Sequence, residues 1–131
     1  RGQKIIYFVI DLTSEKNIKH FIRRIENWII KILKNYKIKS TNDPNNIGIW
    51  VENKEGVEKI AAIGIRVKKW IAFHGFSLNM NVNKRDYNGI IPCGINNKGI
   101  ANMSDFINLS SLENINEIII LEFKKTFPNM F

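Results

Sequence analysis

The sequence predicts one α+β domain, with a mixed or antiparallel sheet covered on one face by two helices. Three observations support this. An early apolar run mixes β-branched and aromatic residues, two longer stretches repeat apolar residues at helical spacing, and short apolar runs separated by turn residues lie between them. The order strand, helix, several antiparallel strands, helix is typical of α+β layer packing.

The first two elements are a strand and a long helix. Residues 5–10 are apolar without interruption, which predicts a strand buried on both faces. Residues 11–14 then lead into a helix, and its apolar stripe indicates core packing more than a groove for a partner. The stripe consists of Ile18, Phe21, Ile22, Ile25, Ile29, Ile32, Leu33 and Tyr36.

The central part of the chain predicts strands joined by turns. The polar segment 40–46 contains Pro44 and is expected to be a loop. A strand is expected at 48–51, a turn ending in glycine at 53–56, the second strand of that hairpin at 57–67, and a further strand at 71–82.

The C-terminal part predicts a second helix. Residues 95–109 are expected to be loop or short helix, and Ser110 with Glu113 fits a capping box that would begin a helix reaching about residue 126. Its inward side would carry Ile115, Ile118, Ile119, Phe123 and Phe127.

Composition places the chain among globular proteins. Of its 131 residues, 44% are hydrophobic and 24% charged, and no apolar run is long enough to span a membrane. We expect one domain over residues 1–131 and a cytoplasmic location, or an organelle matrix in a eukaryote. The formal net charge of +8 favours acidic partners, although compositional bias towards lysine, asparagine and isoleucine would also produce it.

The single cysteine, Cys93, lies in a Pro-Cys-Gly turn after an apolar pair. Proline fixes one backbone angle and glycine permits unusual ones, so this turn can hold a nucleophile at a strand end. A nucleophilic cysteine needs a nearby cation to favour its thiolate, and the candidates are Lys59, His74 and Arg66. The alternative is that Cys93 is a small buried apolar residue.

Lys59 stands at the start of an otherwise apolar strand. Regular alternation would put it on the same face as Ala61, Ile63, Ile65 and Val67. A lysine there either extends to the rim or takes part in chemistry. The small residues that follow it allow a ligand to approach the strand closely. A lone histidine beside aromatic residues, as His74 is, is more often a structural residue than a ligand. Since His20 is the other histidine of the sequence, a zinc site is not expected.

Four segments together resemble a known family. They are residues 48–51 (Gly-Ile-Trp-Val), 59–67 (Lys-Ile-Ala-Ala-Ile-Gly-Ile-Arg-Val), 74–79 (His-Gly-Phe-Ser-Leu-Asn) and 91–94 (Ile-Pro-Cys-Gly). In this order, they closely resemble the lipoyl(octanoyl) transferases, of the lipoate-protein ligase B type. The resemblance runs from Gly2 to at least Cys93 and implies the catalytic-domain fold of biotin and lipoate protein ligases.

The resemblance also implies a function. Octanoyl would pass from acyl carrier protein to a thioester on Cys93 and then to a lysine of a lipoyl domain, the first step of lipoate biosynthesis. Lys59 would lower the pKa of the thiol and shuttle the proton. One wall of the acyl pocket would be Ala62, Ile63 and Gly64, and the other would be Gly75, Phe76 and Ser77 beside His74.

The implied partners are octanoyl-acyl carrier protein, the lipoyl domains of 2-oxoacid dehydrogenases, and the glycine cleavage H protein. Neither nucleic acid nor membrane is implied as a partner, and no metal, nucleotide or other cofactor is implied.

The chain departs from the family at several points. Gly2 and Gln3 fit the end of a His-Gly-Pro-Gly-Gln motif, but Arg1 stands where proline belongs, and the Arg-Gly-Gly segment that holds the acyl group is not in the chain. Residues 100–103 replace a Val-Thr-Ser-Leu stretch. We therefore expect the C-terminal portion of such a domain.

Three alternatives remain open. The first is an inactive remnant that acts at most as a protein-binding module. A ligase that forms an adenylate is disfavoured, because it needs no cysteine nucleophile. A basic RNA-binding domain is disfavoured by scattered lysines and the lack of a stacking motif.

Overall fold

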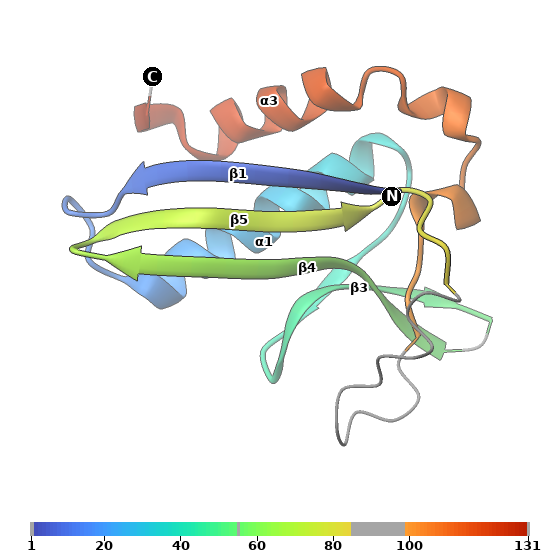
Figure 1. Cartoon of the computed structure of the whole chain (residues 1–131), viewed down its shortest axis with the longest axis horizontal. Helices are drawn as coiled ribbons and strands as arrows, with labels where there is room; N and C mark the ends of the chain where they lie inside the picture. Colours follow the sequence, from blue (N-terminus) through green and yellow to red (C-terminus); the bar gives the residue numbers. More distant parts are fainter. Residues whose placement is uncertain (1, 55, 85–98, 131) are drawn as a thin grey trace.

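The structure is a computed structural model that describes residues 2–54, 56–84 and 99–130. It confirms the α+β prediction, with an antiparallel sheet whose one face is covered by helices (Figure 1). The strands are β1 (Gln3–Asp11), β2 (Thr41–Asp43), β3 (Asn46–Asn53), β4 (Gly56–Lys68) and β5 (Ile71–Asn79), in the spatial order β1-β5-β4-β3-β2. The helices are α1 (Ile18–Asn35) and α3 (Ile115–Thr126), with 3-10 turns η1 (Met103–Asp105), η2 (Leu109–Leu112) and η3 (Pro128–Met130).

Helix α1 supplies the centre of the core. The predicted apolar stripe is confirmed except at Ile18, the first residue of the helix, which is 41% exposed. Asn17 caps its first turn by accepting a hydrogen bond of 3.0 Å from the His20 amide. The prediction omitted Trp28, which is 2% exposed and stands edge-on to Phe76 of β5 at 5.0 Å between ring centroids. The Trp28 indole also donates a hydrogen bond of 3.0 Å to the Ile119 carbonyl, which ties α1 to α3.

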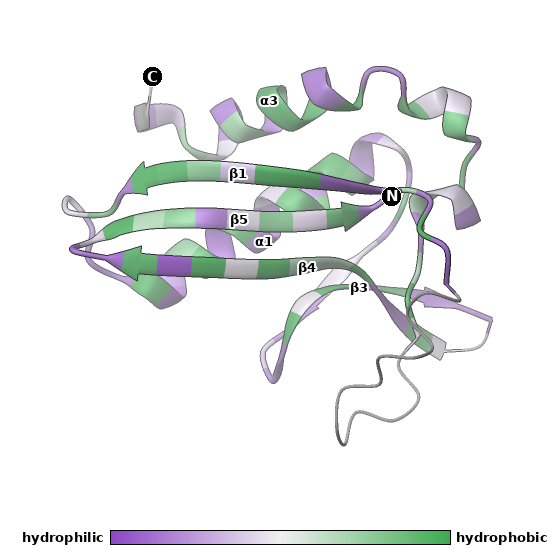
Figure 2. Ribbon diagram, viewed as in Figure 1, coloured by the Kyte–Doolittle hydropathy of each residue, from purple (hydrophilic) through white to green (hydrophobic). Residues whose placement is uncertain are grey.

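Strand β1 is buried on one face only. Ile10 is 3% exposed and Phe8 packs on Phe21, whereas Ile5, Tyr7 and Val9 are 53%, 75% and 77% exposed. The predicted burial of this strand on both faces is therefore wrong for the described residues. In that part of the chain, β1 forms one edge of the sheet. Figure 2 shows this strand as largely hydrophobic along its length. We call Ile5, Tyr7 and Val9 the open row of β1.

The predicted loop at 40–46 is wrong in part, because residues 41–43 form the short strand β2. Its residues are polar and exposed or half-buried, so no hydrophobic alternation marks it, and its backbone pairs with β3. The strand predicted to run to residue 82 ends instead at Asn79.

Among the residues that the structure describes, no helix is long and apolar enough to cross a membrane.

The capping box predicted at Ser110 and Glu113 is also wrong. Residues 109–112 form the 3-10 turn η2, and α3 begins only at Ile115 with Asn114 as N-cap. The inward residues of that helix are as predicted, since Ile115, Ile119 and Phe127 are buried.

Replacing Trp28 with alanine is expected to reduce the free energy of unfolding by about 3–5 kcal/mol, because a large buried aromatic is lost together with a hydrogen bond. Ile120→Ala, on the exposed side of α3 with 54% exposure, is the matched control and should change that free energy by about 0.5 kcal/mol or less. Urea unfolding of both variants measures the difference. Equal losses would contradict the central place of Trp28.

The open row of β1 is expected to cause self-association at micromolar concentration, because an apolar strand at a sheet edge pairs readily with another chain. The double variant Tyr7→Lys, Val9→Lys should lower the mass measured by sedimentation. The control Ile120→Lys, Leu121→Lys adds the same charge to exposed apolar residues of α3 and should not lower it. A wild-type chain that stays monomeric would contradict this expectation.

Candidate functional site

An irregularity in the ladder between β3 and β4 shapes the surroundings of Lys59. Ile49 pairs with Ala61 and Trp50 pairs with Lys59, so Ile60 is an extra residue in β4. Ile60 and Ala61 are both fully buried, which regular alternation would not produce. The simple alternation predicted from Lys59 onward is therefore interrupted at its first step by a β-bulge, a feature that redirects side chains.

The Lys59 side chain lies along β3. Its ammonium nitrogen is 5.0 Å from the centroid of the Trp50 ring, a cation–π distance. Trp50 is itself 5% exposed and donates from its indole to the Asn46 carbonyl at 3.2 Å. A Cβ atom added to Gly48 would stand 2.9 Å from Lys59 Cε, so the glycine leaves the room in which the lysine chain lies.

The main chain of Lys59 holds a different part of the protein. Its amide donates to the Gly99 carbonyl at 3.0 Å, and its carbonyl accepts from the Ala101 amide at 2.9 Å. These two bonds form a parallel bridge between Lys59 and Ile100. Since β5 ends at Asn79, residues 99–101 take its place beside β4 at this level.

The two predicted walls of an acyl pocket lie side by side on the sheet. Ala62 pairs with Ser77, and Gly64 pairs with Gly75. Cross-strand partners share a face, and on this face Ser77 is next to Ile5 and Gly75 is next to Tyr7. On this face Ala62 and Gly64 are exposed, Ser77 is half-buried and Gly75 is buried, and we call these four small residues the strip; the open row of β1 borders it.

Gly75 is required by the packing of β1 on β5. A Cβ atom there would stand 1.9 Å from the Ile6 carbonyl oxygen, which no side chain could accommodate. At Gly64, by contrast, an added Cβ would meet no atom within 4 Å. Contacts within the described residues therefore require glycine at position 75 but not at position 64.

Three other predicted residues lie away from this strip. Ile63 and Phe76 pair across β4 and β5, and Phe76 is in the core against Trp28. His74 has a positive φ of 72°, is exposed, and places its ring 4.9 Å from Phe73. It pairs with Ile65, so the structure does not bring it beside Lys59.

Cys93 and the turn that carries it lie outside the described residues. The chain on either side is described up to Lys84 and again from Gly99. The predicted proximity of the Cys93 sulfur and the Lys59 amine therefore stays a prediction.

Sequence reasoning missed two buried asparagines close to Lys59. Asn79, 6% exposed, directs its amide nitrogen to the Lys59 carbonyl at 3.4 Å and accepts from Gln3 at 3.0 Å. Asn102 is 3% exposed and bonds to the main chain of Val82. Asparagine is common throughout this sequence, so the sequence alone does not distinguish these two positions from the other asparagines.

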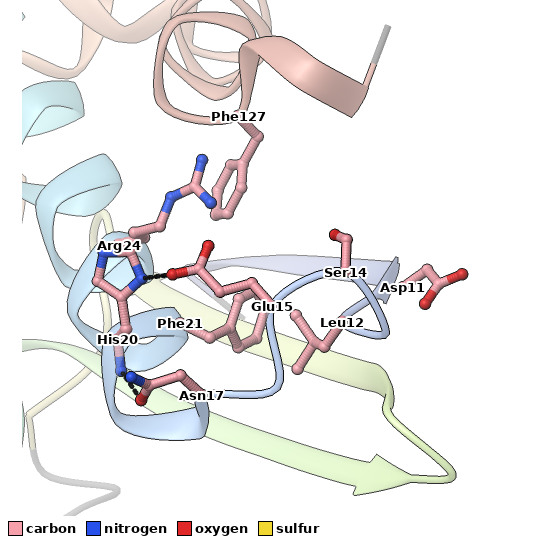
Figure 3. Close-up of a pocket in the computed structure, with 9 residues that line it drawn as sticks. All are labelled: Asp11, Leu12, Ser14, Glu15, Asn17, His20, Phe21, Arg24 and Phe127. Carbon is pink, nitrogen blue, oxygen red and sulfur yellow. Dashed lines mark hydrogen bonds and ion pairs between the residues drawn. The ribbon is translucent and has the colours of Figure 1, made fainter.

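A separate hollow lies at the start of α1 (Figure 3) and shares no lining residue with the surroundings of Lys59. The His20 Nδ1 atom lies 2.6 Å from the Glu15 carboxylate there. Arg24 donates to the Thr126 carbonyl at 2.6 Å and lies over the Phe127 ring. These contacts give the polar side chains of the hollow a structural role. Within the described ranges, no group of three or more His, Cys, Asp or Glu side chains could hold a metal ion.

At the edge of this hollow, Asp11 accepts hydrogen bonds from the side chain and the backbone amide of Thr13. These two bonds lower the pKa of the Asp11 carboxyl group.

Comparison with known proteins gives consistent results. The sequence profile described as "Lipoyl protein ligase A/B catalytic domain" matches residues 1–125. An octanoyltransferase of Wolbachia pipientis is 43% identical over 128 residues, which cover 96% of this chain and 62% of that protein. An octanoyltransferase of Bartonella tribocorum is 40% identical, and the match covers 99% of this chain and 56% of the relative. The chain thus spans about three fifths of the length of such relatives.

Solved structures share the fold. A lipoate-protein ligase A bound with ATP superposes with a TM-score of 0.74 at 15% identity, covering 95% of this chain and 52% of that one. The biotin protein ligase of Aquifex aeolicus gives a TM-score of 0.62 at 15% identity, covering 95% of this chain and 54% of that one. The predicted resemblance to biotin and lipoate ligase catalytic domains is thereby confirmed as a matter of fold.

Gly48→Ala is expected to displace the Lys59 side chain. Both Gly48 and Gly56 have positive φ, at 138° and 126°, so alanine at either costs about 1–3 kcal/mol of backbone strain. Gly56→Ala is the control, because its added Cβ would meet nothing within 4 Å. Acetylation of the Lys59 amine, followed by mass spectrometry, should change rate in Gly48→Ala only. The same rate in both variants would contradict the contact.

Proposed function

Because the chain belongs to the lipoyl protein ligase A/B catalytic domain family, we propose that it carries the acyl-transfer chemistry of an octanoyltransferase. The donor is octanoyl-acyl carrier protein, and the acceptor is a lysine of a lipoyl domain. The observation that carries this proposal is the double role of Lys59. Its main chain holds residues 99–101, which follow the Cys93 segment, while its amine projects over Trp50 from the same residue.

Chain connectivity supports the pairing of Cys93 with Lys59. Gly99, whose carbonyl accepts from the Lys59 amide, is six positions after Cys93 in the sequence. A fully extended segment of that length reaches about 20 Å, so Cys93 cannot be farther than this from Gly99. This upper limit is compatible with the proposed pairing of Cys93 with Lys59, which lie 34 positions apart in the sequence.

In the first half-reaction, the Cys93 thiolate attacks the carbonyl carbon of the donor thioester. A carbon–sulfur bond to Cys93 forms, the bond to the carrier sulfur breaks, and the Lys59 ammonium gives its proton to the departing thiolate. The ammonium also favours the thiolate form of Cys93 beforehand.

In the second half-reaction, the neutral amine of the acceptor lysine attacks the acyl group on Cys93. The carbon–nitrogen bond forms as the bond to the Cys93 sulfur breaks, and the proton lost by the attacking nitrogen goes to the Lys59 amine. Both residues return to their starting states. The donor is already activated as a thioester, so the cycle uses no nucleotide.

The strip of Ala62, Gly64, Gly75 and Ser77 is the proposed wall for the octanoyl chain. Small side chains allow an acyl chain to lie close to a sheet. The exposed apolar side chains of Ile5 and Tyr7 border the strip. The net charge of +8 suits acidic carrier and lipoyl domains.

Transfer is preferred over ligation because the relatives named octanoyltransferase are up to 44% identical, whereas the ATP-bound ligase is 15% identical. The second candidate is a protein-binding remnant without transferase activity. It is favoured by residues 100–103, which replace the hydroxyl-bearing stretch expected after the cysteine.

The test is acylation of Cys93 by octanoyl-acyl carrier protein, measured as a mass shift, followed by transfer to a lipoyl domain. The full-length Wolbachia octanoyltransferase is the positive control. An acyl-Cys93 adduct that passes its octanoyl to the lipoyl domain is expected. A chain that binds the lipoyl domain but never gains the adduct would favour the remnant.

Lys59→Ala is expected to slow acylation by about 100-fold or more, because a positioned proton donor is lost. Lys59→Arg keeps the charge but cannot exchange the proton, so it should preserve alkylation of Cys93 by iodoacetamide at neutral pH while losing transfer. Lys68→Ala, exposed at the far end of β4, is the matched control and should keep both. Equal rates in the Lys59 and Lys68 variants would remove Lys59 from the mechanism.

A further inference from the structure

Trp50 and Lys59 are direct partners across β3 and β4 because of a shift in register. The preceding pair in the ladder joins Ile49 to Ala61. In a regular ladder, the next pair would join Trp50 to Ile60. The extra residue at Ile60 brings Lys59 opposite Trp50 instead. Directly opposite residues carry their side chains on the same face of a sheet and close together, so the bulge makes an indole ring the neighbour of the lysine.

The Lys59 side chain follows one row of β3. Its Cε atom lies over Gly48, where an added Cβ would stand only 2.9 Å away, and its ammonium nitrogen is 5.0 Å from the centroid of the Trp50 ring. Positions 48 and 50 are two residues apart in a strand and therefore share a face. The apolar stem of the lysine thus passes over the glycine, and its charged end reaches the aromatic ring.

The Trp50 ring is held in place by its own contacts. It is 5% exposed, its indole donates to the Asn46 carbonyl at 3.2 Å, and its residue also pairs with Thr41 of β2. A buried and hydrogen-bonded indole presents a fixed face. Lys59 is half-buried, and in the described part of the chain none of the ion pairs involves it. The direction of its amine therefore depends on the ring.

We propose that Trp50 is a positioning residue, whose ring face holds the Lys59 ammonium in the direction that proton transfer requires. The inference rests on the proposed function, in which this amine gives and takes the proton. Indole attracts cations more strongly than the other aromatic side chains do. The attraction acts on the ammonium and not on the neutral amine. Loss of the proton therefore releases the side chain from the ring, and its return restores the contact.

The test compares Trp50→Phe with Trp50→Leu. Both variants lose the indole hydrogen bond and some buried volume, but only phenylalanine keeps an aromatic face. Acetic anhydride acetylates free amines, and peptide mapping by mass spectrometry gives the rate at Lys59 relative to Lys68, an exposed lysine at the far end of β4, in the same sample. This relative rate should rise about fivefold in Trp50→Leu and less than about twofold in Trp50→Phe, because the ring restrains the amine.

Two further measurements separate positioning from loss of stability. Ile32→Val lies in the α1 core with no exposure, and it should lower the melting temperature without changing the relative rate at Lys59. In octanoyl transfer from octanoyl-acyl carrier protein, Trp50→Leu should lower kcat by about tenfold at an unchanged KM, since a misdirected proton donor affects the chemical step and not donor binding. Trp50→Phe should retain most of kcat.

Each outcome has a distinct meaning. Equal Lys59 rates in Trp50→Phe and Trp50→Leu would overturn the positioning role, and so would a rise in Ile32→Val as large as that in Trp50→Leu. The expected rates with an unchanged kcat in Trp50→Leu would overturn the positioning role and leave the proposed function standing. The expected rates in a chain that transfers no octanoyl would support the hold of the ring on the amine and refute the proposed function.

Discussion

The peptide group of Lys59 is the constraint on which this site depends. A regular antiparallel sheet would continue β5 beside β4, but β5 stops at Asn79, and both hydrogen-bonding groups of Lys59 turn to Gly99 and Ala101. Unpaired buried main-chain groups are costly, so these two bonds fix the returning segment firmly. The bulge at Ile60 and the glycine at position 48 then allow the side chain of the same residue to lie over Trp50.

The helical face of the sheet has a different role from the open face. Trp28 gathers aromatic rings from β1, β5, α3 and the C-terminal segment into one cluster, which holds the strands rigidly from behind. The open face carries small residues where β4 and β5 meet and apolar residues along β1. A rigid sheet with one uncovered side is a suitable support for a site built from strand residues and the segments between them.

Sequence reasoning recovered the parts that depend on local periodicity. The α1 stripe, the hairpin of β3 and β4, and the inward residues of α3 follow from spacing alone, and the structure confirms them. It missed β2, whose three residues are polar, and the bulge at Ile60, which shifts the alternation by one position. It also missed Asn79 and Asn102, because their partners lie about twenty residues away and side-chain spacing does not encode main-chain bonds to distant segments.

The stacking of Lys59 on Trp50 has a spectroscopic consequence. Indole fluorescence responds to the electric field across the ring, and the Lys59 ammonium group, 5.0 Å from the centroid, contributes to that field. The chain has three tryptophans; Trp28 is enclosed by aromatic rings, and Trp70 lies 5.9 Å from the amine of Lys16 at the opposite end of β4. A change in the position of the Lys59 amine is therefore expected to change the emission of Trp50, which would serve as an optical probe without any added label.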